Sequence, residues 1–359
     1  MKKVNIIGGG INGLLLAALL SKDGYFVNVF EKRKNTGGRA FLYEKDGFVI
    51  DNGLHITRFG PHSPVGKVMK YIGKEIKYKK MGKSYLINNQ NKKYNYPRNP
   101  IGFLTSNMFS ISEKLQIAKL MLSVKRGDFN HMDDIPLIDW MDQQNVRGGI
   151  KLFFEMLSGS MMVCPFIGKT SSGDMFRIMQ RMVKLGRTIE YPANGWKPIY
   201  EGLTSQIEKN GKINLKNKVD EVILNGVNAK GVLIDGIEIQ SDIVVINLPV
   251  QDLFTVLPEE RFPNEYVDLC KNILPTSGTF IDIALDKCIG KQDGLLYTYD
   301  PVTIGMITSN VAKNIAPTGK QLLTFWYPTS REDVLDKKMK PMMLKSTIDL
   351  YAHKSSLVL

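Results

Sequence analysis

Cysteine and histidine are scarce in this chain of 359 residues, and both scarcities exclude classes of function. The three cysteines, Cys164, Cys270 and Cys288, lie far apart and form no C-x-x-C pair. We therefore expect neither a disulfide-stabilised fold nor a zinc site built from cysteines. The cysteine pattern is consistent with a reducing compartment. The four histidines form no H-E-x-x-H motif, so we expect no metal at the site.

Long apolar runs are also lacking. The apolar stretch Val4–Leu20, which follows two lysines, resembles a secretory signal peptide, but Gly8, Gly9 and Gly10 interrupt it and no small-x-small cleavage site follows. No other stretch approaches the ~20 apolar residues that span a bilayer. We therefore expect a cytoplasmic protein, with peripheral contact to the inner face of a membrane as a further expectation.

Acidic residues are fewer than basic ones, with 35 Asp and Glu against 48 Lys and Arg, so the formal net charge is +13. Lysines are densest in Lys67–Lys93. A solvated face is the plain interpretation of this run, and the sharper alternative is an edge that meets anionic lipid, where each Lys adds ~1 kcal/mol. Nucleic acid is not an expected partner, because no zinc finger, RNP-like aromatic stripe or recognition-helix pattern accompanies the charge.

Secondary structure is strongly patterned at the start of the chain. Val4–Ile7 and Tyr25–Phe30 are predicted strands, and Asn12–Ser21 between them is a predicted helix. A strand, a helix and a strand within about thirty residues form a right-handed parallel crossover. From Ser110 to Lys184 helical periodicity dominates, with predicted helices at Ile111–Val124, Leu137–Gln143 and Met175–Val183, the last carrying a methionine stripe expected in the core rather than in a pocket.

A β-rich region follows a predicted helix at Ile199–Lys209. Asn225-Gly226 and Asp235-Gly236 are two-residue hairpin turns, so Val219–Ile239 is predicted to be a three-stranded meander. The apolar run Ile243–Leu248 is typical of a strand buried on both faces of a parallel sheet. Further elements are predicted at Ile213–Leu215, Thr279–Leu285, Gly305–Thr308, Leu322–Trp326 and, as a last helix, Glu332–Tyr351.

The motif with the clearest chemistry is Gly8-x-Gly10-x-x-Gly13, between the first strand and the first helix. Gly8 permits the tight turn, Gly10 lets the backbone approach a pyrophosphate, and Gly13 lets the helix pack closely. The backbone N–H groups of Ile11 and Asn12 would then face the phosphates. Glu31 follows Gly13 by 18 positions, where a carboxylate accepts ribose hydroxyls and repels a 2′-phosphate. NADP is therefore disfavoured, whereas NAD and FAD stay open.

Three further segments resemble the FAD-dependent amine oxidase and phytoene desaturase superfamily, in its phytoene-dehydrogenase-like branch. They are Glu31-Lys32-Arg33, Gly37-Gly38-Arg39-Ala40 and Asp51-x-Gly53-x-His55. The resemblance implies FAD as the cofactor, with Lys32, Gly38 and Arg39 along its ADP half. It also implies that Gly53 and His55 lie near the flavin, and that backbone near Val219 meets the adenine.

The same resemblance implies an α/β fold with a Rossmann-like FAD-binding domain, whose parallel sheet carries a β-meander crossover, and a discontinuous α+β substrate domain. The expected organisation is FAD-binding at 1–70 and 191–250, substrate domain at 71–190 and 251–330, and a C-terminal helix at 331–359. One departure is that superfamily members close with a Gly-Asp element and a Gly-rich helix at the flavin, and neither follows Trp326. Truncation, a partner chain that completes the flavin site, and incomplete flavin binding are the alternatives.

These features favour an oxidoreductase that takes hydride equivalents from a small apolar, isoprenoid or carotenoid-precursor-like substrate. An amine oxidase or protoporphyrinogen-oxidase-like activity is the rival within the class. A non-catalytic, truncated flavin-binding subunit is the rival outside it. Catalytic residues are not assigned by the sequence, and His55 and Arg58 are only the polar groups nearest the expected flavin.

Overall fold

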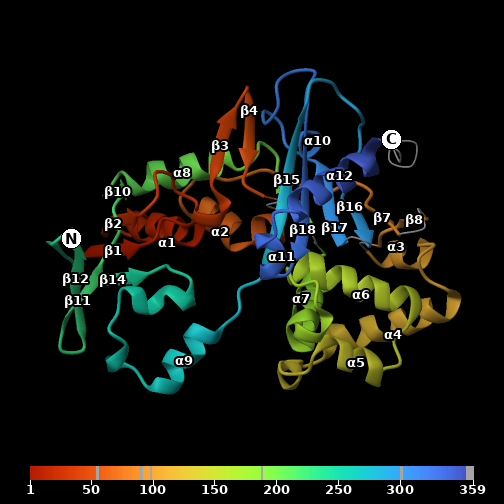
Figure 1. Cartoon of the computed structure of the whole chain (residues 1–359), viewed down its shortest axis with the longest axis horizontal. Helices are drawn as coiled ribbons and strands as arrows, with labels where there is room; N and C mark the ends of the chain where they lie inside the picture. Colours follow the sequence, from red (N-terminus) through yellow and green to blue (C-terminus); the bar gives the residue numbers. More distant parts are fainter. Residues whose placement is uncertain (54–55, 89–91, 98, 187–188, 300–301, 353–359) are drawn as a thin grey trace.

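A computed structural model describes residues 1–53, 56–88, 92–97, 99–186, 189–299 and 302–352. Two sheets organise the chain (Figure 1). The first is entirely parallel, with strand order β10-β2-β1-β14. Its strands are β1 (Lys3–Ile7), β2 (Phe26–Glu31), β10 (Gly211–Leu215) and β14 (Ile243–Ile246). The predicted Rossmann-like parallel sheet is confirmed.

Helices α1 (Ile11–Lys22) and α8 (Lys197–Ile207) pack together on one face of this sheet. Leu14, Ala17 and Ala18 of α1 are fully buried with the inward side chains of β1 and β2. The hydroxyl of Ser21 donates to the carbonyl oxygen of Gln206 at 2.7 Å and joins the two helices. The helices predicted at both positions are confirmed.

The opposite face is covered by a meander of β11 (Glu221–Asn225), β12 (Asn228–Ile234) and β13 (Ile237–Gln240). It connects β10 to β14, so the predicted β-meander crossover is confirmed. Its first turn contains Gly226 and its second contains Asp235 and Gly236, and all three residues have positive φ. One expectation was wrong: β14 is not buried on both faces but half-buried, because it is the edge strand beside β1.

The second sheet is mixed, with strand order β15-β18-β17-β16-β7-β8. Its strands are β7 (Tyr85–Ile87), β8 (Lys93–Asn95), β15 (Ser277–Leu285), β16 (Leu296–Tyr299), β17 (Val302–Ile307) and β18 (Gln321–Thr329). Side chains alternate between its faces. Trp326 packs against the main core, and its neighbour Tyr327 packs in a separate apolar cluster beneath the last helix.

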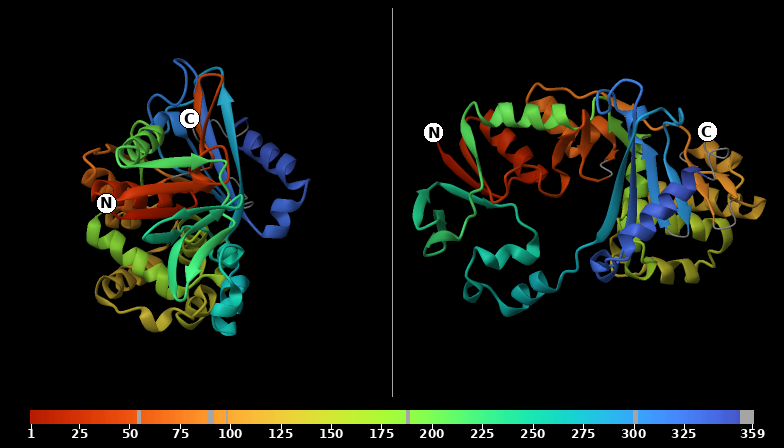
Figure 2. Two further views of the ribbon diagram at one scale, coloured as in Figure 1. Left: turned by 90° about the vertical axis from the view of Figure 1, so that its left-hand side faces the viewer. Right: turned by 45° about the horizontal axis from the view of Figure 1, so that its top comes forward.

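Helices cover both faces of this sheet, as Figure 2 shows. On the main-core side lie α3 (Pro100–Thr105), α4 (Ile111–Arg126), α5 (Leu137–Gln143), α6 (Gly148–Met161) and α7 (Ser172–Leu185). A capping box at Ser110 and Glu113 begins α4. The helices predicted within Ser110–Lys184 are confirmed. Of the methionine stripe, Met175 and Met179 are buried in the core, and Met179 and Met182 also line a cavity.

The single C-terminal helix predicted for Glu332–Tyr351 was wrong, because the segment forms α11 (Arg331–Leu335) and α12 (Met339–Ala352). Pro341 explains the interruption. In one continuous helix, Pro341 could not donate to the carbonyl of Lys337, and its ring would clash with that turn. In the first turn of α12 the missing N–H has no cost.

The remaining elements connect the sheets. They are β3 (Leu42–Lys45), β4 (Phe48–Asp51), β5 (Thr57–Arg58), α2 (Pro64–Tyr71), β6 (Tyr78–Lys80), β9 (Ile189–Pro192), α9 (Asn264–Asn272) and α10 (Thr308–Val311). Strands β5, β9 and β6 form a small antiparallel sheet. The chain thus alternates between the two large sheets, and the residue bounds of the domains stay a prediction. Within the described ranges, every helix is too short or too polar to cross a bilayer.

Candidate cofactor and substrate site

The glycine turn lies between the end of β1 at Ile7 and the start of α1 at Ile11. Gly8 has φ of +100°, and a Cβ there would lie 2.6 Å from the carbonyl oxygen of Asn247. A Cβ on Gly13 would lie 2.3 Å from the carbonyl oxygen of Gly8. The fold itself therefore requires these two glycines.

Gly10 is different, because no packing contact explains its missing side chain. It has extended backbone, and the nearest described atom to a Cβ there is the Asn247 amide nitrogen at 3.5 Å, an ordinary contact. As the N-cap of α1 it also has no side chain to bond the N–H groups of the first turn, at Ile11 and Asn12. The turn thus leaves space and donors for an anion such as a pyrophosphate, and the residues present fit the phosphates of a dinucleotide.

Glu31 ends β2 at the mouth of the same crossover, and only 6% of it is exposed. Its Oε2 accepts the N–H of Gly9 at 2.8 Å, and its Oε1 accepts the N–H of Arg33 at 2.9 Å. A carboxylate has about four acceptor positions, so two are left after these bonds. Glu31 is therefore fixed in place and still able to accept from hydroxyl groups. The neighbouring Lys32 is exposed.

The Gly-Gly-Arg segment folds onto the glycine turn. The N–H of Gly37 donates to the carbonyl oxygen of Gly9 at 2.8 Å, and a Cβ on Gly38 would lie 3.2 Å from the Cα of Gly10. Both Gly37 and Gly38 have positive φ. The exposed side chain of Arg39 follows directly. The structure thus brings together two motifs that the sequence analysis linked only by resemblance.

Val219 was expected in a strand, and that expectation was wrong because β11 begins two residues later, at Glu221. Val219 is instead buried in the apolar cluster that includes Phe30. Two residues before it, the N–H of Asn217 donates to the carbonyl oxygen of Glu31 at 3.0 Å. This backbone is therefore bonded to the main chain of Glu31, and its contact with an adenine stays a prediction.

Asp51, at the end of β4, is buried beside a second carboxylate that the sequence did not indicate. The hydroxyl of Tyr191 donates to its Oδ2, whereas no described residue bonds its buried Oδ1. Burial is the main cause that raises the pKa of Asp51 to about 7, and the charge of Asp282 adds to it. Burial also raises the pKa of Asp282 to about 6, against the hydrogen bond that Thr324 donates to it at 2.7 Å.

Gly53, two residues after Asp51, is buried with φ of +116°. His55 lies outside the described residues. Sequence reasoning could not find Asp282, because β15 lies more than 200 positions from β4 in the chain. The tyrosines around the pair are also held in place: Tyr200 donates to the carbonyl oxygen of Ala40 at 2.5 Å.

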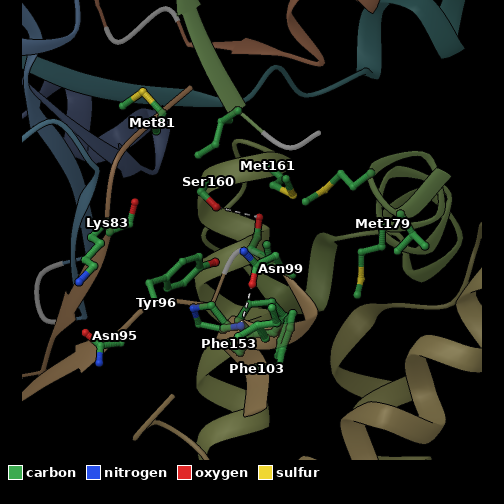
Figure 3. A pocket seen from close by; sticks show the side chains of 18 of the residues that line it. Met81, Lys83, Asn95, Tyr96, Asn99, Phe103, Phe153, Ser160, Met161 and Met179 are labelled. Atoms are coloured by element: carbon green, nitrogen blue, oxygen red, sulfur yellow. Dashed lines mark hydrogen bonds between the residues drawn. The ribbon is translucent and has the colours of Figure 1, made fainter. Parts of the chain in front are cut away.

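A cavity of about 1090 Å³ lies between the second sheet and the helices α3, α4, α6 and α7 (Figure 3). Its lining is mainly aliphatic, aromatic and thioether side chains. Ile56 and Arg58, just after the Asp51–Gly53 element, also line it. Among its other lining residues are Met81, Lys83, Tyr96, Phe103, Phe153, Leu157, Ser160, Met161, Met179 and Tyr297.

Two large side chains at this cavity are held in place by their neighbours. The guanidinium of Arg58 donates to the carbonyl oxygen of Met161, and burial lowers the pKa of Arg58. The ring of Tyr96 stacks on Tyr297 with centroids 4.3 Å apart. Burial raises the pKa of Tyr96 well above its ordinary value, so its phenol stays neutral. These contacts shape the wall and assign no catalytic role to Arg58.

Comparison with known proteins agrees with this architecture. A family model described as an NAD(P)-binding Rossmann-like domain matches residues 6–72. An uncharacterized protein of Methanocaldococcus jannaschii is 26% identical over 89% of this chain and 76% of its own length. A 15-cis-phytoene desaturase of Synechococcus elongatus is 23% identical over 94% of this chain and 78% of its own.

A solved oxidoreductase structure from Methanosarcina mazei superimposes with a TM-score of 0.81 at 23% identity, covering 97% of this chain and 84% of that one. Its likeness concerns the fold. The family resemblance noted in the fingerprint residues is thus matched along nearly the whole chain. The chain is therefore similar, along nearly its whole length, to proteins of the FAD-dependent amine oxidase and phytoene desaturase superfamily.

Proposed function

We propose that this chain is an FAD-dependent oxidoreductase that takes hydride equivalents from an apolar, isoprenoid-like substrate. One observation carries the substrate class: the mainly apolar cavity of about 1090 Å³ begins at Ile56 and Arg58, directly after the Asp51–Gly53 element that resembles a flavin-side motif. The volume suits an extended hydrocarbon chain rather than a small polar molecule.

The residues that would hold the cofactor are those of the first crossover. Glu31 would accept the ribose hydroxyls with its two remaining acceptor positions. The N–H groups at the start of α1 and the Arg39 side chain would compensate the phosphate charge, with Gly10 leaving the space. When bound, FAD would supply the two-electron oxidant that accepts hydride equivalents from the substrate.

The cavity side chains would bind the substrate by shape and by exclusion of water. Phe153, Met161 and Met179 offer apolar surface, and thioether side chains adapt to an irregular hydrocarbon. The buried Tyr96 phenol stays neutral, and Arg58 is engaged by the Met161 carbonyl. The named activity of the Synechococcus relative, desaturation of phytoene, supports an isoprenoid substrate.

The amine oxidase alternative calls for an aromatic pair that faces the flavin ring, and the adjacent residues Trp326 and Tyr327 could imitate one in the sequence. They do not form such a pair, because Trp326 packs toward the main core and Tyr327 packs beneath α12. This arrangement favours the hydrocarbon substrate. A non-catalytic flavin-binding subunit is the alternative that the same experiment tests.

The test is anaerobic reduction of the FAD-loaded protein, followed at the flavin absorbance band, with polyene precursors and with a panel of amines. We expect bleaching with the polyene precursors only. The Ser160→Phe variant places a ring in the cavity and should take up FAD normally but lose this reduction, whereas Ser205→Phe, on the exposed side of α8, should keep both. Reduction by amines alone would establish the rival enzyme, and no reduction by either panel would favour the non-catalytic subunit.

A further inference from the structure

The outer surface of α3 and α4 carries an unusual concentration of exposed aliphatic side chains. Ile101 and Leu104 of α3 and Ile111, Leu115 and Leu122 of α4 are between 63% and 81% exposed. This group is called the aliphatic face below. It lies at the end of the molecule far from the parallel sheet (Figure 1). Single exposed aliphatic residues are ordinary, but a contiguous set indicates an interaction site.

The spacing on α4 places these side chains in one row. Positions 111, 115, 118 and 122 repeat at intervals of four and three, which is one side of a helix. The exposed Ala118 fills the row between Leu115 and Leu122. Ile117 and Val124, on the other side of the helix, are buried in the core. Since that side already anchors α4, the outward row is not needed to hold the helix in place.

Basic side chains border the row on both sides. At 100° per residue, Lys114 and Lys125 fall along one edge of the row, and Lys119 and Arg126 fall along the other. The acidic residue of this helix, Glu113, is turned inward and accepts the N–H of Gly149 at 2.6 Å. The face therefore combines aliphatic side chains with positive charge.

This chemistry matches the interfacial region of an anionic bilayer better than a protein surface. Protein interfaces favour Trp, Tyr, Met and Arg and are depleted in Lys. Leucine and isoleucine flanked by lysines are typical of helices that lie in the headgroup region, where lysines reach the lipid charges. The excess of basic residues across the chain, with a net charge of +13, has the same sign.

Part of the aliphatic face is also a wall of the cavity. Ile101, Leu104 and Ala118 line it, as do Lys114 and Met121 of α4. On its inner side α3 is held by Phe103, whose ring stacks on Phe109 and meets the edge of Phe153. Side chains that are exposed at the surface thus also line the cavity, so the cavity reaches the exposed row, and a bilayer on the row would adjoin it.

We propose that α3 and α4 dock this protein on an anionic lipid bilayer and that apolar substrate passes from the bilayer into the cavity past Ile101, Leu104 and Ala118. The route rests on the proposed function, but the docking does not. The lysines of Lys67–Lys93 contribute only in part, because they are divided among α2, β6, β8 and the segments between them, and Lys80 and Lys83 line the cavity.

Flotation with phosphatidylcholine vesicles, with and without 30% phosphatidylglycerol, tests the docking. We expect the wild type to float with the anionic vesicles, and the Leu115→Asp/Leu122→Asp variant to float at least tenfold less. The matched control is Leu269→Asp/Leu274→Asp near α9, where the two leucines are 60% and 77% exposed, and it should float like the wild type. The Lys119→Gln/Arg126→Gln variant should still float, but the difference between its flotation with anionic and with neutral vesicles should be smaller than for the wild type.

Wild-type protein that stays unbound, or equal flotation of the Leu115→Asp/Leu122→Asp variant, would overturn the proposal. If the wild type forms dimers and binds no vesicles, and this variant no longer forms dimers, the proposal is overturned and the aliphatic face is an interface between copies of the chain. FAD uptake by the variant, read from flavin absorbance, shows that it is folded. If the wild type binds vesicles but takes up no FAD, the proposed function is contradicted and the docking stands. If it takes up FAD but does not bind vesicles, the docking is contradicted and the proposed function stands.

Discussion

The N–H of Gly9 donates to the Oε2 atom of Glu31 at 2.8 Å across the first crossover. This bond joins the glycine turn to the residue that ends β2. It fixes the buried carboxylate beside the start of α1, where a dinucleotide would present its ribose and its phosphates. Both consequences, one for stability and one for ligand binding, can be measured separately.

Replacing Glu31 should destabilise the protein even without a ligand. Glu31→Ala leaves the N–H groups of Gly9 and Arg33 without their carboxylate acceptor, and the free energy of unfolding should fall by about 2 kcal/mol. Glu31→Gln keeps one acceptor oxygen and should lie between this variant and the wild type. Urea denaturation of the FAD-free proteins measures the order. Equal stability of all three would show that the carboxylate does not hold the turn.

Two alanine substitutions separate glycines that serve the fold from the glycine that serves a ligand. Gly13→Ala puts a Cβ 2.3 Å from the Gly8 carbonyl oxygen and should lower the free energy of unfolding by about 1–3 kcal/mol. Gly10→Ala has no contact under 3.5 Å, so its stability should stay close to that of the wild type while its affinity for FAD falls at least tenfold. Unchanged FAD affinity in Gly10→Ala would mean that phosphates do not approach this residue.

Much of this fold was predictable because local patterns determine it. The glycine motif and the first crossover depend on residues within 30 positions of one another, and the two hairpin turns of the meander depend on Asp235, Gly236 and Gly226. The periodicity of Ile111–Val124 predicted α4, but not that its outward row of aliphatic residues would remain exposed.

Features that depend on distant parts of the chain were not predictable. Strands β7 and β8 have three residues each and exist because β7 pairs with β16, more than 200 positions away. The approach of Asp282 to Asp51 and the meeting of Tyr96 with Tyr297 have the same origin. A cavity lined from both sheet and helices has no signature in one segment of sequence.

The buried carboxyl of Asp51 should make stability fall as the pH rises. Its pKa in the folded protein is raised from 3.8 to about 7, so the folded state binds this proton more tightly than the unfolded chain does. The favourable contribution is complete below about pH 4 and is lost between about pH 4 and 7. Asp51→Asn should therefore reduce the loss of stability between pH 5 and 8 by about 2–3 kcal/mol.

Thermal or urea unfolding across this pH range checks the prediction. Asp282→Asn should also reduce the loss, since the pKa of Asp282 is raised to about 6. Asp286→Asn is the control, because Lys320 lowers the pKa of this exposed carboxyl. A pH dependence that Asp51→Asn leaves unchanged would contradict the assignment.

The last helix should depend on one tyrosine hydroxyl. Tyr327 is buried, and its hydroxyl donates to the carbonyl oxygen of Met343 at 3.0 Å and bonds the hydroxyl of Thr347 at 2.5 Å. Tyr327→Phe should lower the free energy of unfolding by about 1 kcal/mol. Limited proteolysis should cleave α12 faster in this variant, while FAD uptake is unchanged. If protease cleaves α12 no faster in the variant than in the wild type, apolar packing alone holds this helix in place.

Titration of the purified, ligand-free protein with FAD, followed by quenching of flavin fluorescence, tests the central claim most directly. The geometry of Gly10, Glu31 and the start of α1 predicts saturable binding of one FAD per chain. ADP should compete with it, NADP should compete far less, and Glu31→Ala should weaken it at least tenfold. Absence of saturable FAD binding, or equal binding by Glu31→Ala, would contradict the claim that this crossover holds the ADP half of FAD.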